Sequence, residues 1–470
     1  MLGFFKTYKT QVFTHVLMLA GVAIGAYYFL SADSSAAAGF TARSKTRPLP
    51  AFPALDQDAN QFEIQTALIR NARECFPVHI REQAKIGIMY LYCSDDAFEA
   101  DAHGVDITAN FTVPEGIARR YNFWRRVYSL WSKDQYVLHV ANYPEVVLEV
   151  FDIARIAPEM SGIEQERFTR GLAKAQRAEY RKLLLALHAH RNRPVTDLTP
   201  AMQRIARAMR HIPDQQKYLK AATGLRVQRG QREFIAKGLT VGPKYLPYIE
   251  QEFEAQGIYP EIARLAYIES SFNLLARSKV GASGVFQIMP ETGRQYLIMT
   301  DGVDERNDPI KASRAAAKLL RYNFQTLGSW PLAITAYNHG AGGLKKAIRA
   351  TGRRDLIYLV NNYSSKSFQF ASSNFYAGFL GLLATLKESD RIFPEVEKVE
   401  PLKFNSVRLQ AYTNIATIKK RYNLSTDDIA VFNPDMTRAF IRSNGTLPRG
   451  YVIKVPAREK SSVAMLTGHQ

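Results

Sequence analysis

The sequence predicts a mainly α-helical protein with a small α+β domain near its C-terminal end. Apolar residues between about positions 56 and 391 recur with the period of an α-helix, about 3.6 residues. A short stretch near the C-terminus instead alternates apolar and polar residues, as a strand does. A chain of 470 residues is also too long for one hydrophobic core, so two or three domains are expected.

The N-terminus has the order of an export signal. Lys6 and Lys9 precede an apolar run over residues 16–30, and small residues follow in "SADSSAAAG". Residues 1–32 are therefore predicted to be a signal peptide or, if uncleaved, a membrane anchor. Either alternative places the remainder of the chain in the periplasm or cell envelope. The stretch 33–55, rich in Ala, Ser, Thr and Pro, is expected to be a linker.

The chain has two cysteines, Cys75 and Cys93. In an exported protein these residues are able to form a disulfide. However, "PVHIREQAKIGIMYLY" between them looks partly helical. One straight helix would hold the two sulfur atoms about 20 Å apart, which is beyond bridging distance. The sequence therefore leaves the pairing open.

The charge balance favours an anionic partner. There are 62 Lys and Arg residues against 43 Asp and Glu residues, which gives a net charge of +19. Nucleic acid, lipid head groups and an acidic cell-wall polymer all fit that charge. The sequence has no zinc-finger spacing, no basic region leading into heptads and no Gly-aromatic signature of a single-strand-binding sheet. Nucleic acid is therefore not the expected partner.

Two helical regions are expected before the C-terminal domain. In the first, "YRKLLLALHAHRN" places three leucines on one helix face, and "FWRRVYSLW" holds four large aromatic side chains. Core packing is favoured over a sugar-binding platform for these aromatic residues. The residues are Leu183, Leu184 and Leu187 in the first stretch and Phe123, Trp124, Tyr128 and Trp131 in the second. The predicted domains span residues 56–235, 236–391 and 402–457, with a tail at 458–470.

The C-terminal domain is expected to contain two strands and two helices. Ser425 and Asp428 have the spacing of a capping box, so a helix is predicted from about Thr426 to Val431. In "GYVIKVP" the apolar residues alternate, which predicts a strand with one face on the core. These apolar residues are Tyr451, Ile453 and Val455.

Glu269 is the leading candidate for chemistry. In "LAYIESSFN" it falls inside an apolar helical stripe formed by Ile262, Leu265, Ala266 and Phe272. Burial in such surroundings raises the pKa of a carboxyl group towards neutrality, as a general acid requires. The structural alternative is a glutamate that is bonded to a buried backbone group or to an arginine.

Two further motifs place polar side chains beside glycines. "SKVGASGVFQIMPETG" holds Gly284 and Gln287 in a predicted loop, and "ITAYNHGAGG" places Tyr337 and Asn338 ahead of a second glycine cluster. Glycine lets backbone approach a ligand, and amide side chains suit sugar hydroxyl and acetamido groups. No Ser-His-Asp group, Walker loop, H-E-x-x-H motif or cysteine cluster is present, so no cofactor and no metal are expected.

At these motifs the chain resembles the lytic transglycosylases of the goose-type lysozyme-like superfamily, in particular the membrane-bound lytic murein transglycosylase D group. The resemblance covers most of residues 240–390 and implies a lysozyme-like α catalytic domain. The Glu-Ser and Phe-Asn pairs are matched by Glu269, Ser270, Phe272 and Asn273, the Gly-x-x-Gln motif by Gly284 to Gln287, and the Ala-Tyr-Asn motif by Ala336, Tyr337 and Asn338.

Two departures from the family pattern stand out. A later Asn-Tyr motif is replaced by Asn374-Phe375, and Tyr376, one place on, is expected to point elsewhere. The C-terminal domain resembles a LysM peptidoglycan-binding module, but "QAYTNIATI" stands where that module has its Gly-Asp-Thr turn.

The resemblance implies cleavage of the β-1,4 bond between N-acetylmuramic acid and N-acetylglucosamine in peptidoglycan, with formation of 1,6-anhydro ends. Glu269 would act as acid and then as base, and the substrate-binding residues would be Ser270, Gly284, Gln287, Tyr337 and Asn338. A lysozyme-type hydrolase, which needs a second carboxylate, and a non-catalytic wall-binding scaffold are the alternatives. Candidates for that second carboxylate are Glu291, at a predicted helix start, and Asp301, Asp304, Glu305 and Asp308, in a stretch expected to be a solvated loop.

Overall fold

The computed structural model describes residues 74–82, 85–94 and 104–457, with the backbone alone at 74–94. The predicted export signal, linker and tail lie outside the described residues. Helices dominate the described chain, as predicted. By contact the chain divides into two compact units, which are Met1–Ala236 with Leu327–Pro394 and Lys237–Thr326 with Glu395–Gln470. The predicted catalytic domain, residues 236–391, contributes its first part to the second unit and its last part to the first.

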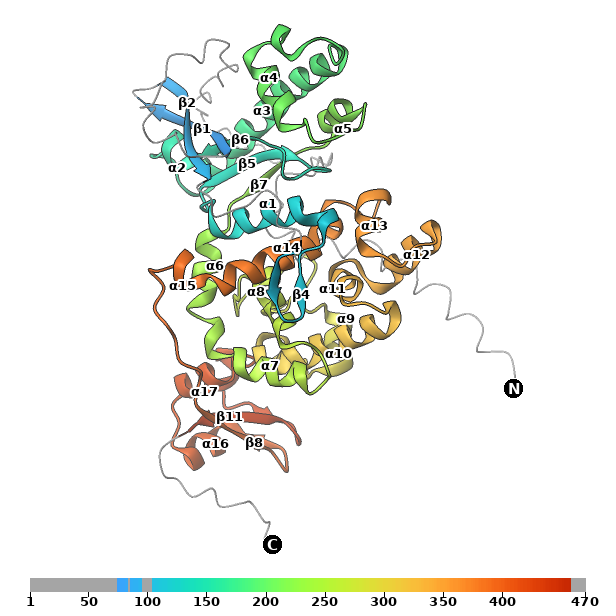
Figure 1. The fold of residues 1–470 in the computed structure, drawn as a ribbon. Helices are drawn as coiled ribbons and strands as arrows, with labels where there is room; N and C mark the ends of the chain where they lie inside the picture. Colours follow the sequence, from blue (N-terminus) through green and yellow to red (C-terminus); the bar gives the residue numbers. More distant parts are fainter. Residues whose placement is uncertain (1–73, 83–84, 95–103, 458–470) are drawn as a thin grey trace, which may run out of the picture. The chain divides into compact units, whose positions relative to one another are not determined.

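The first unit contains a five-stranded sheet in the order β2-β1-β6-β5-β7 (Figure 1). Strand β1 is parallel to β6, and the other neighbours are antiparallel. The helical pattern expected throughout residues 56–235 is therefore wrong at these strands. Strands β5 and β6 are buried on nearly every residue, and such short apolar runs have no period that separates strand from helix. The strands are β1 (Glu74–Glu82), β2 (Lys85–Ser94), β5 (Gln135–Val140), β6 (Val147–Asp152) and β7 (Leu225–Arg229).

The hairpin of β1 and β2 replaces the partial helix expected between the cysteines. Its register pairs Cys75 with Cys93 as Cα partners. Opposed residues in an antiparallel pair have Cα atoms about 4.5–5.5 Å apart. A disulfide requires a Cα separation of about 4.4–6.8 Å. The backbone register thus removes the objection based on distance, and the disulfide stays a prediction.

Helices of the first unit cover the sheet. Leu184 and Leu187, from the predicted leucine face, lie in one core with Leu138 and Leu148 of the strands, and all four are at most 6% exposed. Figure 1 shows α3, α4 and α5 beside this sheet. These helices span Gly162–Ala189, Pro200–Ala208 and Lys217–Thr223.

The long helix α14 (Phe370–Lys387) packs along α1 (Ala118–Ser129). A Cβ atom on Gly381 would lie 2.8 Å from the Arg125 backbone nitrogen, so the close approach requires glycine. The aromatic residues predicted to pack are buried here, at 3% exposure or less. They are Phe123, Trp124, Tyr128 and Trp131.

The second unit gathers short helices around an aromatic core. Phe253, on α7 (Leu246–Glu254), stacks on Phe286 with ring centroids 5.9 Å apart. Phe272 packs against Tyr267 at 5.1 Å. Helices α8 (Leu265–Ser270) and α9 (Pro290–Tyr296) and most of α10 (Pro309–Leu327) belong to this unit, together with the C-terminal domain.

The C-terminal domain has the capping box and the strand that the sequence predicts. Ser425 and Asp428 exchange side-chain and backbone hydrogen bonds at the start of α17 (Thr426–Phe432). Tyr451, Ile453 and Val455 are at most 4% exposed. Three elements go beyond the predicted two strands and two helices, namely the two strands of a second short pair and a third helix. The elements are β8 (Phe404–Arg408) paired with β11 (Val452–Pro456), β9 (Thr413–Asn414) paired with β10 (Thr446–Leu447), α16 (Ile415–Tyr422) and α18 (Arg438–Arg442).

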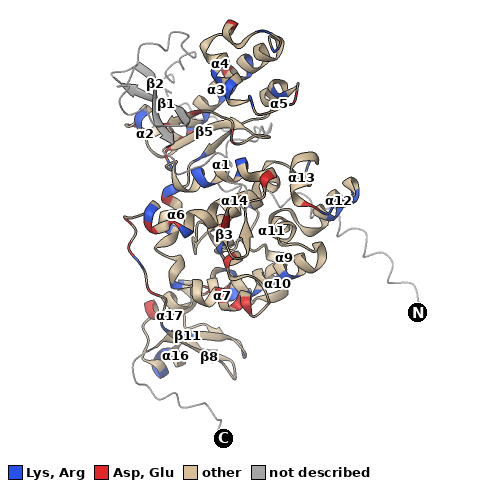
Figure 2. Cartoon of the chain, viewed as in Figure 1, with Lys and Arg blue, Asp and Glu red and all other residues tan. Residues whose placement is uncertain are grey.

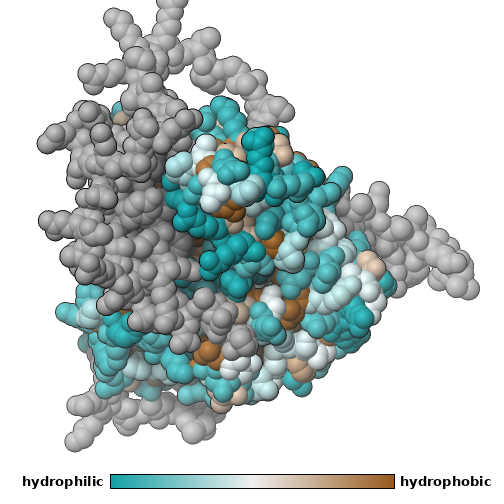
Figure 3. Space-filling model, turned by 45° about the horizontal axis from the view of Figure 1, so that its top comes forward, coloured by the Kyte–Doolittle hydropathy of each residue, from teal (hydrophilic) through white to brown (hydrophobic). Residues whose placement is uncertain are grey.

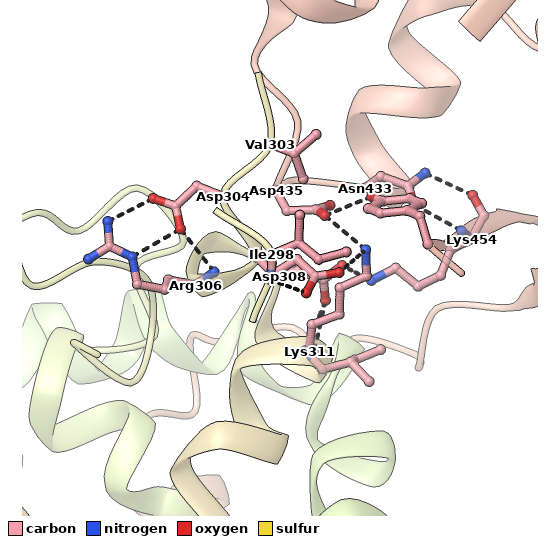
Figure 4. A network of polar contacts seen from close by, with 12 residues as sticks. Ile298, Val303, Asp304, Arg306, Asp308, Lys311, Asn433, Asp435 and Lys454 are labelled. Atoms are coloured by element: carbon pink, nitrogen blue, oxygen red, sulfur yellow. Dashed lines mark hydrogen bonds and ion pairs between the residues drawn. The ribbon is translucent and has the colours of Figure 1, made fainter. Parts of the chain in front are cut away.

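A buried network of charges joins the C-terminal domain to the start of α10 (Figure 4). Lys454 of β11 pairs with Asp308, and Lys311 lies 2.8 Å from Asp435. Each of these four side chains is at most 6% exposed. Val303 also belongs to the apolar core of the C-terminal domain. The C-terminal domain and the segment before α10 therefore share one core.

This network corrects the expectation of a solvated loop at residues 301–308. Asp308 is fully buried, and Glu305 is 9% exposed, whereas Asp301 is exposed. The sequence pattern misses the burial of Asp308 because the cation that pairs with it comes from a distant segment. Lys454 is 146 positions away from its partner.

Exposed apolar residues are scattered. Leu275 and Tyr412 are 81% and 76% exposed, but they come from distant segments. On the face drawn in Figure 3, hydrophobic residues form small separate patches among hydrophilic ones. Such single exposures are ordinary for globular proteins.

Candidate active site

Glu269 lies near the end of the six-residue helix α8 and is 5% exposed. The helix stops because Ser271 and Phe272 both adopt the left-handed conformation, with φ of 51° and 58°. This conformation is unfavourable for residues other than glycine, and such strain concentrates at functional sites. Phe272, three residues after the glutamate, lies in the core and is 1% exposed.

The Glu269 carboxyl group is buried without a partner. Neither carboxylate oxygen has a hydrogen-bond partner in the described part of the chain. Burial raises the pKa of Glu269 from 4.5 to about 8. The alternative of a glutamate tied to a backbone group or an arginine therefore finds no support among these residues. A carboxyl group in this state holds a proton at neutral pH and is able to donate it.

Ser270 fastens α8 to the neighbouring loop. Its hydroxyl lies 3.0 Å from the carbonyl oxygen of Val285 and 3.1 Å from that of Ala266. The same oxygen accepts a hydrogen bond from the backbone N–H of Asn273. With 8% exposure, Ser270 thus holds the glutamate helix and the glycine loop together.

Gly284 allows that loop to pass close to another segment. Its φ is 75°, and a Cβ atom at this position would lie 1.7 Å from the carbonyl oxygen of Arg306. Arg306 in turn donates to the carbonyl oxygens of Gly281 and Ile288, at 2.7 and 3.2 Å. The loop is therefore fixed from both sides, and no other residue type fits at Gly284.

Gln287 follows in a strained backbone conformation, with φ of 46°. Its amide nitrogen donates to the carbonyl oxygens of Ala276 and Gly284, at 3.2 and 2.9 Å. Both donors are thus committed to the protein. The side-chain oxygen is the atom of this amide that remains for a ligand donor.

Tyr337 and Asn338 lie in the other compact unit, on α11 (Trp330–His339). Asn338 is 4% exposed, and its oxygen accepts a hydrogen bond from Ser372 at 3.2 Å. Its amide nitrogen has no partner among the described residues. Since Glu269 belongs to the second unit and these two residues to the first, their convergence on one groove stays a prediction.

His339 and Ser372 adjoin the candidate residue Asn338, and sequence reasoning did not single them out. His339 Nδ1 lies 3.0 Å from the hydroxyl oxygen of Ser372, and both residues are buried. The histidine stands directly after the Ala-Tyr-Asn motif, which was the available signal. No sequence signal pointed to Ser372, because it is 34 positions from Asn338 and the two residues come into contact only in the folded chain.

The departure at Asn374-Phe375 places two aromatic residues inside the first unit. Phe375 is 1% and Tyr376 is 6% exposed. Burial raises the pKa of Tyr376 above its ordinary value. Asn374 accepts hydrogen bonds from Arg120 and Trp124, both at 3.3 Å, and so is committed to the packing of α1 against α14.

Residues 247–359 match the model of the transglycosylase SLT domain. The matched segment contains Glu269, Gly284, Gln287, Tyr337 and Asn338 and draws on both compact units. The chain thus carries a transglycosylase SLT domain.

The chain is homologous to the membrane-bound lytic murein transglycosylase D of Escherichia coli strain K12. Identity is 27% over 206 residues, which are 43% of this chain and 44% of that protein. A putative tributyltin chloride resistance protein of an Alteromonas species is 36% identical over 106 residues, 22% of this chain and 51% of its own length. This chain therefore spans about half the length of these relatives. The crystal structure of the 70 kDa soluble lytic transglycosylase Slt70 of Escherichia coli aligns with 48% of this chain and 33% of its own, at 18% identity and a TM-score of 0.24.

Proposed function

We propose that this protein is a lytic transglycosylase that cleaves the β-1,4 bond between N-acetylmuramic acid and N-acetylglucosamine in peptidoglycan. One observation carries the proposal. Within the matched SLT segment, Glu269 is 5% exposed, has no hydrogen-bond partner among the described residues and has its pKa raised by burial to about 8. Such a group is protonated at neutral pH, and because no described residue accepts its proton, that proton is available to a substrate oxygen.

The proposed reaction uses this carboxyl group twice. Protonated Glu269 donates its proton to the glycosidic oxygen, and the bond to the muramic acid C1 breaks. The resulting carboxylate then takes the proton of the muramic acid 6-hydroxyl, whose oxygen attacks C1 and closes a 1,6-anhydro ring. The proton count balances, because Glu269 ends as it began, and no water enters the product.

The state of the other carboxylates favours this reaction over hydrolysis. An inverting hydrolase needs a second carboxylate to activate water. Asp304 is held by Arg306, with contacts of 3.0 and 2.8 Å, and Glu305 lies 3.2 Å from Lys311. Asp308 is paired with Lys454. Because these three carboxylates are paired with cations, Glu291 and Asp301 are the candidates for a second carboxylate that are left. Both are exposed to solvent.

The partner and location follow from the same proposal. The partner would be the glycan strands of peptidoglycan in the cell envelope, with membrane association through the predicted N-terminal segment. No described helix is both long and apolar enough to cross a bilayer. Figure 2 marks Lys and Arg positions on helices such as α12 (Ala341–Thr351) and α16, which suits an anionic polymer. The LysM-like domain is proposed to contribute to wall binding.

The test is digestion of peptidoglycan sacculi by the purified protein, followed by mass spectrometry of the products. Products with 1,6-anhydro ends are expected, and Glu269→Gln should abolish them while thermal unfolding shows a folded protein. Glu291→Gln is the matched control, since it removes an exposed carboxylate of the same segment, and should retain activity. Products with ordinary reducing ends would identify a hydrolase, and binding without products would identify a scaffold.

A further inference from the structure

Asn338 and His339, at the end of α11, form a hydrogen-bonded relay with Ser372 of α14, and the relay has a defined direction. The Ser372 hydroxyl donates to Asn338 Oδ1 at 3.2 Å, and His339 Nδ1 lies 3.0 Å from the same Ser372 oxygen. All three residues are at most 7% exposed. Water therefore has little access, and the contacts of Ser372 with Asn338 Oδ1 and with His339 Nδ1 are made within the protein.

The direction of the relay fixes the tautomer of His339. Because the single hydroxyl proton of Ser372 points at Asn338, its oxygen is an acceptor towards His339. His339 Nδ1 must then carry a hydrogen. Burial lowers the pKa of His339 to about 4, so the ring is neutral at neutral pH and has one N–H, which this contact assigns to Nδ1.

The fold holds the His339 ring in this position. Phe368 packs edge-on against it, with ring centroids 5.1 Å apart. A Cβ atom on Gly343 would lie 2.4 Å from His339 Nε2. The second glycine cluster of the sequence thus makes room for the imidazole, which is a role distinct from contact with a ligand.

The end of the relay is a buried donor without a partner. Since Asn338 Oδ1 is occupied, the amide cannot rotate by half a turn without placing its NH2 group against the Ser372 proton. The Nδ2 atom has no hydrogen-bond partner among the described residues. A buried amide nitrogen left unpaired is unfavourable, so a ligand acceptor that reaches it removes that penalty.

We propose that His339 and Ser372 are positioning residues that hold the Asn338 amide as a hydrogen-bond donor to an acceptor oxygen of the glycan, such as an acetamido carbonyl. The inference rests on the proposed function for the identity of the ligand. Without the relay, Asn338 would be free to present its oxygen instead, and the site would lose its preference for an acceptor. The relay therefore sets specificity without touching the substrate.

The test measures binding in the Glu269→Gln background, so that cleavage does not interfere. The probe is a soluble oligomer of N-acetylglucosamine, titrated by calorimetry. Ser372→Ala and His339→Leu are each expected to weaken binding about 5- to 30-fold, because the amide loses its fixed orientation. His339→Asn, whose amide places an N–H near the position of Nδ1, should restore most of the affinity. The double variant Ser372→Ala with Asn338→Ala should bind the oligomer only slightly more weakly than Asn338→Ala alone.

A second readout reports the relay directly. Nitrogen-15 spectra of His339 in the otherwise unaltered protein should show the Nδ1–H tautomer. Ser372→Ala should shift the equilibrium between the Nδ1–H and Nε2–H tautomers. Affinities unchanged in both single variants, or an Nε2–H tautomer, would overturn the proposal. If the relay variants weaken binding but the active protein makes no anhydro products, the proposed reaction fails while the positioning role stands. A structural role alone would lower stability equally in His339→Asn and His339→Leu, without rescue of binding.

Discussion

The ammonium group of Lys454, on the last strand of the C-terminal domain, donates a hydrogen bond to the carboxylate of Asp308, at the start of α10. The two side chains are 5% and 0% exposed. Asp308 also accepts hydrogen bonds from the backbone N–H groups of Ile310 and Lys311, at 3.0 and 3.2 Å. One carboxylate thus begins a helix of the SLT segment and anchors the C-terminal domain.

Lys454→Met is expected to destabilise the protein by about 3–5 kcal/mol, because it leaves a buried carboxylate without its cation. Urea unfolding measures the change. Lys454→Met combined with Asp308→Asn should recover part of the loss, since neither charge then remains unpaired. The matched control is Arg438→Met, which breaks the exposed Arg438–Asp427 pair of 3.0 Å and should cost less than about 1 kcal/mol. Equal losses at the two pairs would contradict a buried anchor.

The stability of the protein should fall between pH 4.5 and about 8 because of Glu269. Its pKa is 4.5 when exposed and about 8 in the folded protein. Across that window the unfolded chain has released the proton and the folded chain has kept it, so rising pH favours unfolding, by up to about 5 kcal/mol. Glu269→Gln removes this dependence. The difference in unfolding free energy between variant and parent should therefore be larger at pH 8 than at pH 5, and a constant difference would argue against the raised pKa.

Cleavage of peptidoglycan should decline as pH rises through about 8, since the proposed acid is then deprotonated. Initial rates on soluble muropeptide chains, measured over pH 5–9.5, give the profile. Binding of the same substrate to Glu269→Gln, which has no ionisable group at this position, should not follow that decline. A rate profile that is flat up to pH 9 would exclude Glu269 as the acid.

Gly284→Ala is expected to destabilise the fold by more than about 3 kcal/mol and to remove activity. The added Cβ would lie 1.7 Å from the carbonyl oxygen of Arg306, and the φ of 75° is strained for alanine. Gly342→Ala is the control, because nothing lies within 4 Å of its Cβ position in α12. That change should be neutral or stabilising by up to about 1 kcal/mol. Thermal unfolding of the two variants tests the contrast.

The register of β1 and β2 leads to a further prediction for the exported protein. Cys75 and Cys93 are Cα partners, so the oxidised chain should contain an intramolecular disulfide. Mass spectrometry of a non-reducing digest should find the two cysteine peptides linked. Two free thiols after isolation from an oxidising compartment would refute the pairing.

Local patterns predicted those parts of the structure that depend on neighbours in sequence. The stripe around Glu269 predicted its burial, and the Ser425–Asp428 spacing predicted the capping box, because both follow from helix geometry. The five-stranded sheet was missed because buried strands such as β6 lack alternation.

Contacts between distant segments determine the features of the structure that local sequence patterns did not predict. Asp308 looked like part of a solvated loop because its partner Lys454 lies in another domain of the sequence. The role of His339 was hidden for the same reason, since Ser372 reaches it only through folding. Amide orientation, tautomer and ion pairing are properties of the assembled core, and no local spacing encodes them.

The shared core between the C-terminal domain and the segment before α10 changes the meaning of a deletion experiment. Cutting the chain after residue 401 would uncover Val303 and leave Asp308 and Lys311 without the partners that Lys454 and Asp435 provide. The truncated protein would be a damaged catalytic segment rather than an enzyme lacking a wall-binding module. Loss of activity on truncation would therefore say nothing about glycan binding, and surface substitutions on α16 are the cleaner way to probe it.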